Sequence, residues 1–122
     1  MLTTTMGAPL VRIRSDTLYG TLSLLILQCV AEGERHGLEI RNRIKQASAD
    51  ALRVDEGALY PALHRLQREG LVQSEWRVSE KKRRAKYYSL TAKGQKHLER
   101  EEKRWRAHVE AVGHVLGGER AS

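Results

Sequence analysis

Lysine and arginine side chains gather in one short stretch of the sequence, between Trp76 and Leu90. Six cations in this stretch stand against the single acid Glu80, while the whole chain has 22 Lys and Arg, 15 Asp and Glu, and a formal net charge of +7. The six are Arg77, Lys81, Lys82, Arg83, Arg84 and Lys86. So concentrated a positive charge attracts a polyanion, and it indicates nucleic acid, an anionic membrane or an acidic protein as partner.

A second group of polar side chains falls on one side of a predicted helix over residues 55–69. Leu59, Leu63 and Leu66 are spaced i, i+4 and i+7, so they must share the core-facing side. The opposite side then carries Gly57, Tyr60, Pro61, His64, Arg65 and Arg68. Hydrogen-bond donors beside an aromatic ring are the chemistry that base edges require. The alternative for Tyr60 is packing on a neighbouring loop.

The sequence offers no set of residues for catalysis or metal binding. It has no paired carboxylates, no activated nucleophile and no glycine-rich phosphate loop, so we expect neither an enzyme nor a cofactor. His97 and His108 are eleven residues apart on one helix, about 16 Å along its axis, which is too far to share an ion. Cys29 is the single cysteine, and its place on an apolar helix face predicts a buried, inert thiol.

Apolar spacing predicts the elements that position these groups. The expected helices cover about residues 16–33, 36–47, 55–69 and 92–116, and the expected strands cover 71–78 and 85–90. In the second helix, Gly37, Ile40, Ile44 and Ala47 are expected to face inward. The strands predict a hairpin with a long, mobile tip. Three helices followed by a hairpin give a mainly α (α+β) winged helix-turn-helix.

The predicted organisation has four parts. These are an N-terminal arm over 1–15, flexible or packed, a winged helix-turn-helix domain over 16–91, a C-terminal dimerisation helix over 92–116, and a tail over 117–122. In a winged helix the third helix lies in the major groove and the hairpin contacts the backbone. Arg41 and Arg43 on the second helix are expected to help the hairpin cations hold phosphates. The alternative for the hairpin tip is a solvated loop.

The last predicted helix carries an apolar stripe longer than so small a domain can cover. Its members are Leu98, Trp105, Val109, Val112 and Leu116. An uncovered stripe of this kind requires a second subunit, and a twofold dimer predicts a palindromic DNA site. Trp105 either anchors the packing or lines a flat apolar slot near the dimer axis, and the two roles are compatible.

Several of these segments resemble the phenolic-acid-decarboxylase regulator (PadR) family of bacterial transcription factors. The resemblance covers about residues 18–116 and is carried by HGLEI at 36–40, EGALYPALHRL at 56–66, Trp76, and RAKYYSLT at 84–91. The single C-terminal helix resembles the short subgroup of the family. This resemblance implies a homodimeric repressor of adjacent genes, held by the last helix packing on its mate and on the first helix, where Leu18 and Leu22 lie. It also implies release from DNA by a small effector, aromatic or amphipathic, with Trp105 at the effector slot.

The remaining signals concern location and rival functions. The longest apolar run, Leu24–Leu27, is far shorter than the roughly 18 residues of a membrane span, so we expect a cytoplasmic protein with no membrane contact. Residues 1–6 lack the pattern of a secretory signal. Two rivals stay open: a winged helix that uses its basic hairpin on an acidic protein partner, and a metal-responsive repressor.

Overall fold

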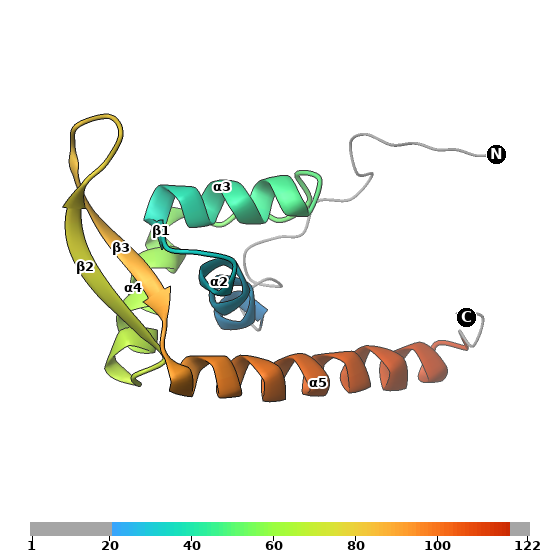
Figure 1. The fold of residues 1–122 in the computed structure, drawn as a ribbon. Coiled ribbons are helices and arrows are strands. Elements are labelled where there is room, and N and C mark those ends of the chain that lie inside the picture. Colours follow the sequence, from blue (N-terminus) through green and yellow to red (C-terminus); the bar gives the residue numbers. More distant parts are fainter. Residues whose placement is uncertain (1–20, 118–122) are drawn as a thin grey trace.

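A computed structural model describes residues 21–117 of the chain (Figure 1). The predicted arm over 1–15, Leu18, the expected start of the first helix and residues 118–122 lie outside the described residues. The elements are α2 (Leu22–Ala31), β1 (Arg35–His36), α3 (Gly37–Ala47), α4 (Glu56–Arg68), β2 (Val72–Val78), β3 (Arg84–Leu90) and α5 (Ala92–Val115). The predicted second, third and last helices and the hairpin are confirmed, with boundaries shifted by one or two residues.

The sheet has three strands in the order β1-β3-β2, and all pairs are antiparallel. The hairpin of β2 and β3 places Trp76 opposite Lys86 and Val78 opposite Arg84. Strand β1 was not predicted, because its two residues are too few to show a period-two pattern. The fold is therefore mainly helical with a small antiparallel sheet, and the hairpin of β2 and β3 forms its wing.

The core surrounds α2, which lies between α3 and α5 in Figure 1 and also packs on α4 and β3. Ile26 and Leu27 of α2 have no exposed surface. Cys29 is buried as predicted, and burial raises the pKa of its thiol to about 11. Tyr88 is also buried, at 2% exposed. Ala47 was expected to face inward and is exposed instead, because it ends α3 beyond the reach of the core.

Short polar contacts fix where the helices begin. The Asp55 side chain accepts a hydrogen bond from the Ala58 N–H at 3.0 Å and caps α4. His36 caps α3 in the same way: its Nδ1 accepts from the Glu39 N–H at 3.3 Å, and the Glu39 carboxylate accepts from the His36 N–H. These caps satisfy backbone donors that have no partner inside the helix.

The tip of the wing, which the sequence predicts to be long and mobile, is closed in the structure by hydrogen bonds of its own backbone. The Lys82 N–H donates to the Ser79 carbonyl at 2.8 Å, and the Ser79 N–H donates to the Arg83 carbonyl at 2.7 Å. Lys82 has a φ of 60°, in the left-handed region. A turn followed by a left-handed residue is a common way to close a hairpin, although glycine or asparagine usually takes that position.

Thr91 joins the turn after α4 to the start of α5. Its hydroxyl donates to the Gly70 carbonyl at 2.7 Å and accepts from the Gly94 N–H at 2.9 Å, while its own N–H donates to the Leu71 carbonyl at 3.1 Å. Gly94 is buried here, and a Cβ added to it would lie 2.0 Å from the Leu71 carbonyl oxygen. The first turn of α5 is therefore seated directly on the backbone before β2.

We expect Gly94→Ala to lower the free energy of unfolding by about 3 kcal/mol, because the new methyl group meets a backbone oxygen that has no room to move. The measurement is urea unfolding followed by circular dichroism. The matched control is Gly113→Ala in the same helix, where nothing lies within 4 Å of the added atom, and we expect no loss there. Equal losses in the two variants would contradict the close seating of α5.

Candidate nucleic-acid interface

Helix α4 buries one side and exposes the other, as its spacing predicts. Leu59, Leu63 and Leu66 are 0%, 0% and 1% exposed, and Ala62 is buried beside them. The exposed side carries five of the six predicted contact residues: Gly57, Tyr60, Pro61, His64 and Arg68. The helix continues through Pro61 without interruption. This face is therefore free to meet a partner.

Tyr60 packs on a neighbouring element and also keeps an exposed surface. Its ring lies on the first residue of α3, so close that a Cβ added to Gly37 would come within 2.5 Å of the phenolic oxygen. The residue is still 37% exposed. Glycine at position 37 thus lets the ring rest on the backbone of α3, where it is held in one orientation at the surface.

Arg65 was predicted among the outward, DNA-contacting residues of α4, but in the structure its side chain turns toward α2. Its guanidinium donates through Nη2 to the Ser23 hydroxyl at 2.6 Å, and the side chain is half-buried. A long arginine side chain can reach around its helix to a neighbouring element, which helical periodicity does not reveal. Arg65 therefore connects α4 to α2.

A hollow of about 570 Å³ separates the exposed side of α4 from the wing. Tyr60 and His64 line it from α4, and Trp76 lines it from β2. The wing cations that line it are Lys81, Arg83, Arg84 and Lys86. Lys82 lies at the tip of the wing and is exposed. The structure thus brings the two groups of residues singled out in the sequence onto opposite sides of one hollow.

The cations that line this hollow, and Lys82 at the tip of the wing, have no acidic partner among the described residues. Nine ion pairs join side chains within residues 21–117, and none involves Lys81, Lys82, Arg83, Arg84 or Lys86. Their charge is therefore available to phosphates, whose binding releases condensed counterions.

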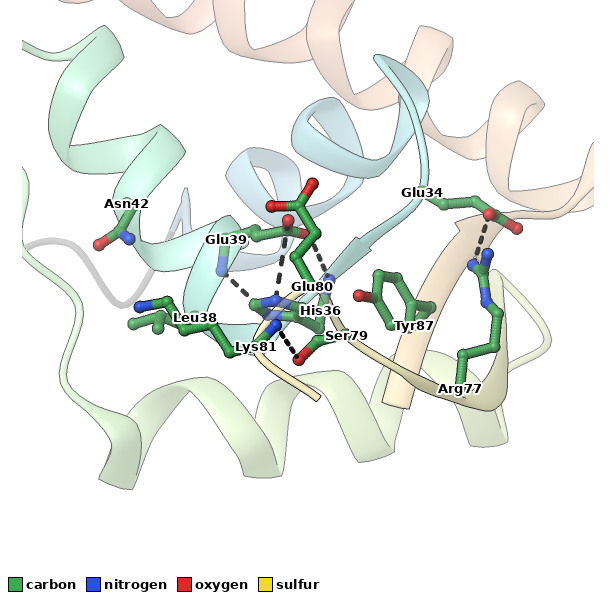
Figure 2. Close-up of a pocket in the computed structure, with 10 residues that line it drawn as sticks. All are labelled: Glu34, His36, Leu38, Glu39, Asn42, Arg77, Ser79, Glu80, Lys81 and Tyr87. Carbon is green, nitrogen blue, oxygen red and sulfur yellow. Dashed lines mark hydrogen bonds and ion pairs between the residues drawn. The ribbon is translucent and has the colours of Figure 1, made fainter. Parts of the chain in front are cut away.

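The other side of the wing has a different character. A hollow of about 420 Å³ there is lined by Arg77, Tyr87, Lys81 and three acids, Glu34, Glu39 and Glu80 (Figure 2). Arg77 pairs with Glu34 at 2.5 Å, which raises the pKa of its guanidinium, and also lies 4.2 Å from the centre of the Tyr87 ring. These contacts neutralise Arg77 within the chain. Among the described residues of the wing, the unpaired cations Arg83, Arg84 and Lys86 line the hollow that faces α4 and not this one.

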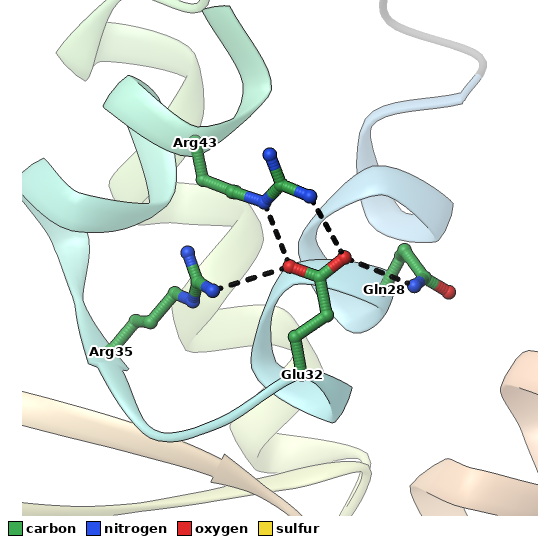
Figure 3. A network of polar contacts seen from close by, with 4 residues as sticks. All are labelled: Gln28, Glu32, Arg35 and Arg43. Carbon is green, nitrogen blue, oxygen red and sulfur yellow. Dashed lines mark hydrogen bonds and ion pairs between the residues drawn. The ribbon is translucent and has the colours of Figure 1, made fainter. Parts of the chain in front are cut away.

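Arg41 and Arg43 were expected to help the wing cations hold phosphates, and in the structure each has hydrogen-bond partners within the chain. They are two residues apart and project from opposite sides of α3. Arg41 donates to the Val54 carbonyl at 2.9 Å and supports the segment that leads into α4. Arg43 donates to Glu32 through Nε at 2.8 Å. Within this network, Glu32 also accepts from Arg35 and Gln28 (Figure 3). Arg43 is therefore committed to α2, away from the hollow beside α4.

The apolar stripe of α5 divides into a covered and an uncovered part. Leu98 is 4% exposed and Leu22 of α2 is 3% exposed, so both belong to the core of the single chain. Both were expected at the contact with a second subunit, and in the single chain they have almost no exposed surface to offer to a partner. Trp105, Val109, Val112 and Leu116 are all exposed, by 41% to 79%. This half of α5 extends past α2 in Figure 1.

Metal binding and membrane insertion find no support in the described residues. His, Cys, Asp and Glu side chains in residues 21–117 form no group of three that could hold a metal ion. No helix in the same range has the length and apolar character needed to cross a membrane.

Trp76 is a residue of the hollow that the sequence reasoning did not include among the contact residues. Its indole is 55% exposed, and the Arg84 guanidinium lies 4.7 Å from the ring centre. The available signal was its register: Trp76 shares a strand face with Ser74 and lies opposite Lys86, so it must point to the same side as the wing cations.

A helix-turn-helix followed by a two-stranded wing, with an exposed polar helix face beside unpaired wing cations, defines the winged-helix class of DNA-binding proteins. A family model described as the transcriptional regulator PadR-like family matches residues 26–100. The chain therefore belongs to this family, whose members are transcriptional regulators and not enzymes. It is a DNA-binding regulator.

Individual relatives agree with this assignment. A transcriptional regulator from Mycobacterium tuberculosis is 38% identical over 96 residues, which cover 79% of this chain and 83% of the relative. A PadR-like transcriptional regulator from Bacillus cereus superposes with a TM-score of 0.73 at 31% identity, covering 86% of this chain and 100% of that one. A transcriptional regulator from Clostridium thermocellum gives a TM-score of 0.75 at 27% identity, covering 84% and 96%.

We expect Glu32→Gln to destabilise the fold at neutral pH and to have no effect in acid. The hydrogen bond from Arg43 lowers the pKa of Glu32 below its ordinary value of 4.5. Its stabilising contribution is therefore complete above pH 4.5 and is lost as the pH falls through the lowered pKa. Urea unfolding at pH 7 and at pH 3 gives the free energy of unfolding of the wild type and of the variant. A difference between these two free energies that does not change with pH would contradict the prediction. DNA affinity should not change, because the network lies away from the hollow.

Proposed function

We propose that this protein is a sequence-specific, homodimeric repressor that binds a palindromic operator near the genes it controls. The observation that carries the proposal is the hollow between α4 and the wing. There the exposed Tyr60 and His64 of α4 face cations of the wing that have no acidic partner among the described residues. Because its target is chromosomal DNA, we place the protein in the cytoplasm.

In the proposed complex, α4 enters the major groove and the wing follows the adjacent backbone. Tyr60 and His64 meet base edges, and Gly57 and Pro61 present little side-chain bulk, so the helix approaches the bases closely. Arg68, near the end of α4, meets a phosphate. Lys81, Lys82, Arg83, Arg84 and Lys86 neutralise the backbone, which positions the protein, while the contacts from α4 specify the sequence.

The uncovered half of α5 supports the dimer. Trp105, Val109, Val112 and Leu116 repeat at intervals of four, three and four residues, which is the spacing of a helix seam that packs on another helix. The same stripe is already buried at Leu98, so a second copy of α5 would continue a packing surface that the single chain begins. A twofold axis along this seam would place two α4 helices on successive turns of the duplex.

The effector site of the proposal lies between α2 and α5. A hollow of about 290 Å³ there is lined by Trp105, Leu24 and Leu27, together with Ser23. Ser23 is the residue that holds Arg65 of α4. A small aromatic or amphipathic molecule against Trp105 would therefore act next to a direct hydrogen bond to the recognition helix. It releases DNA if it binds the DNA-incompetent arrangement more tightly.

We expect replacement of Lys81, Lys82, Arg83 and Arg84 by Ala to weaken binding to every duplex and to flatten its salt dependence. The slope of log affinity against log salt concentration falls by about 0.9 for each lost phosphate contact. Fluorescence anisotropy with labelled duplexes at several salt concentrations measures both quantities.

A control variant removes the same number of charges elsewhere, with Lys45, Lys96, Arg100 and Lys103 changed to Ala. These residues lie on α3 and α5, outside the hollow beside α4. We expect it to keep most of the salt slope. If both variants lose slope equally, the wing is not the phosphate contact and net charge alone explains the binding.

We expect Val109→Asp with Val112→Asp to convert the dimer to a monomer, because each places a carboxylate in the proposed apolar seam. Sedimentation velocity gives the mass directly. Ala107→Asp is the matched control, since residue 107 lies on the opposite side of the helix and is exposed. A wild-type protein that sediments as a single chain would end the dimer proposal, as would a stripe variant that keeps the wild-type mass.

A further inference from the structure

Trp76 is a large apolar side chain in a place where the fold does not bury it. The indole is 55% exposed, although it lies on a paired strand and tryptophan is highly buried on average. The hydrophobic core contains residues of α2, α3, α4, β2, β3 and α5, but Trp76 is not among them. Packing of the core therefore does not explain this side chain.

The two side chains that lie over the ring are both cations of the wing. Trp76 pairs with Lys86 across the hairpin, and Arg84 is two residues from Lys86 on β3, so all three project from one face of the sheet. The Arg84 guanidinium is 4.7 Å from the ring centre and the Lys86 Nζ is 5.8 Å away. Both distances fall within the range in which a cation is attracted to an aromatic face.

This arrangement opens on the hollow beside α4. Trp76, Arg84 and Lys86 all line it, together with Tyr60 and His64 from the helix. Neither cation makes an ion pair with an acid in the described part of the chain. Both cations lie over the indole, which holds them without neutralising their charge.

We propose that Trp76 is a positioning residue for DNA binding, which uses its ring to hold the Arg84 and Lys86 cations toward the phosphate backbone. An acidic partner would also order these side chains, but it would cancel the charge that phosphates require. An aromatic face orders them and leaves their full charge available. The two long side chains then lose part of their conformational entropy before the complex forms, so less is lost when they bind DNA.

The proposed role of Trp76 in holding the cations is separate from any role in keeping the hairpin folded. The hairpin is already held by its continuous strand register from Val72 to Val78 and by the hydrogen-bonded turn at Ser79. Arg77 and Tyr87, on the other face, tie the wing to the segment before β1 through Glu34. Loss of the indole should therefore leave the wing folded and its cations disordered.

The inference rests on the proposed placement of the wing against the DNA backbone. Its test compares Trp76→Leu, which removes the π system, with Trp76→Phe, which keeps an aromatic face. Val78→Ala is the matched control, because Val78 is exposed on the same strand and face but is not aromatic. The probe is a mixed-sequence duplex of about 30 base pairs at low salt, since backbone contacts do not depend on sequence.

We expect Trp76→Leu to bind this duplex about 5- to 30-fold more weakly, the effect of losing two exposed cation–π contacts. Trp76→Phe should lose less than about 3-fold, and Val78→Ala should not differ from wild type. All three should keep the wild-type Tm. Equal losses for the Leu and Phe variants, or no loss for either, would overturn the proposal.

A double-mutant cycle gives the second, independent readout. In a protein that already carries Arg84→Ala and Lys86→Ala, Trp76→Leu should cause no further loss of affinity, because the side chains that the ring holds are gone. A full additional loss would mean that the indole acts on DNA by itself or shapes the fold, and it would overturn the positioning role. If the wild-type protein does not bind the duplex, the result contradicts the proposed function, in which the wing contacts the DNA backbone, and not the role of Trp76 alone.

Discussion

The arrangement of this protein depends on how the leucine side of α4 is buried against the core. Leu59, Leu63 and Leu66 have almost no exposed surface, and three buried positions on successive turns fix the rotation of a helix about its axis. Once that rotation is fixed, Tyr60 and His64 must point outward. The same packing sets the distance between α4 and the wing, so the hollow between them is a consequence of the core and not of the side chains that line it.

Periodicity predicted most of the fold, because it is a local property of the sequence. Helices α4 and α5 begin within one residue of the positions that apolar spacing predicts, and the alternating strands pair as a hairpin. The errors come from contacts between elements. Arg65 was assigned to the outer face by its position, but its long side chain reaches Ser23 on α2. Such a contact joins residues far apart in sequence, where spacing carries no information.

The charge of the site shows the same limit. Composition located the surplus of cations in the wing, but it did not distinguish Arg77, which Glu34 neutralises, from Arg84, which has no acidic partner among the described residues. Glu34, Glu39 and Glu80 lie on one side of the hairpin and balance the charge there, whereas the side that faces α4 is left positive. The exposed Trp76 follows the same division, because strand alternation places it with the uncompensated cations.

The joint at Thr91 has a mechanical consequence. The hydroxyl of Thr91 and the close seating of Gly94 clamp the first turn of α5 to the backbone that follows α4. Helix α5 has 24 residues, so it is about 36 Å long. A difference of about 5° in the direction of its first turn would displace its far end, where Val112 and Leu116 lie, by about 3 Å. The direction in which this exposed end of α5 projects is therefore set by the few contacts at Thr91 and Gly94.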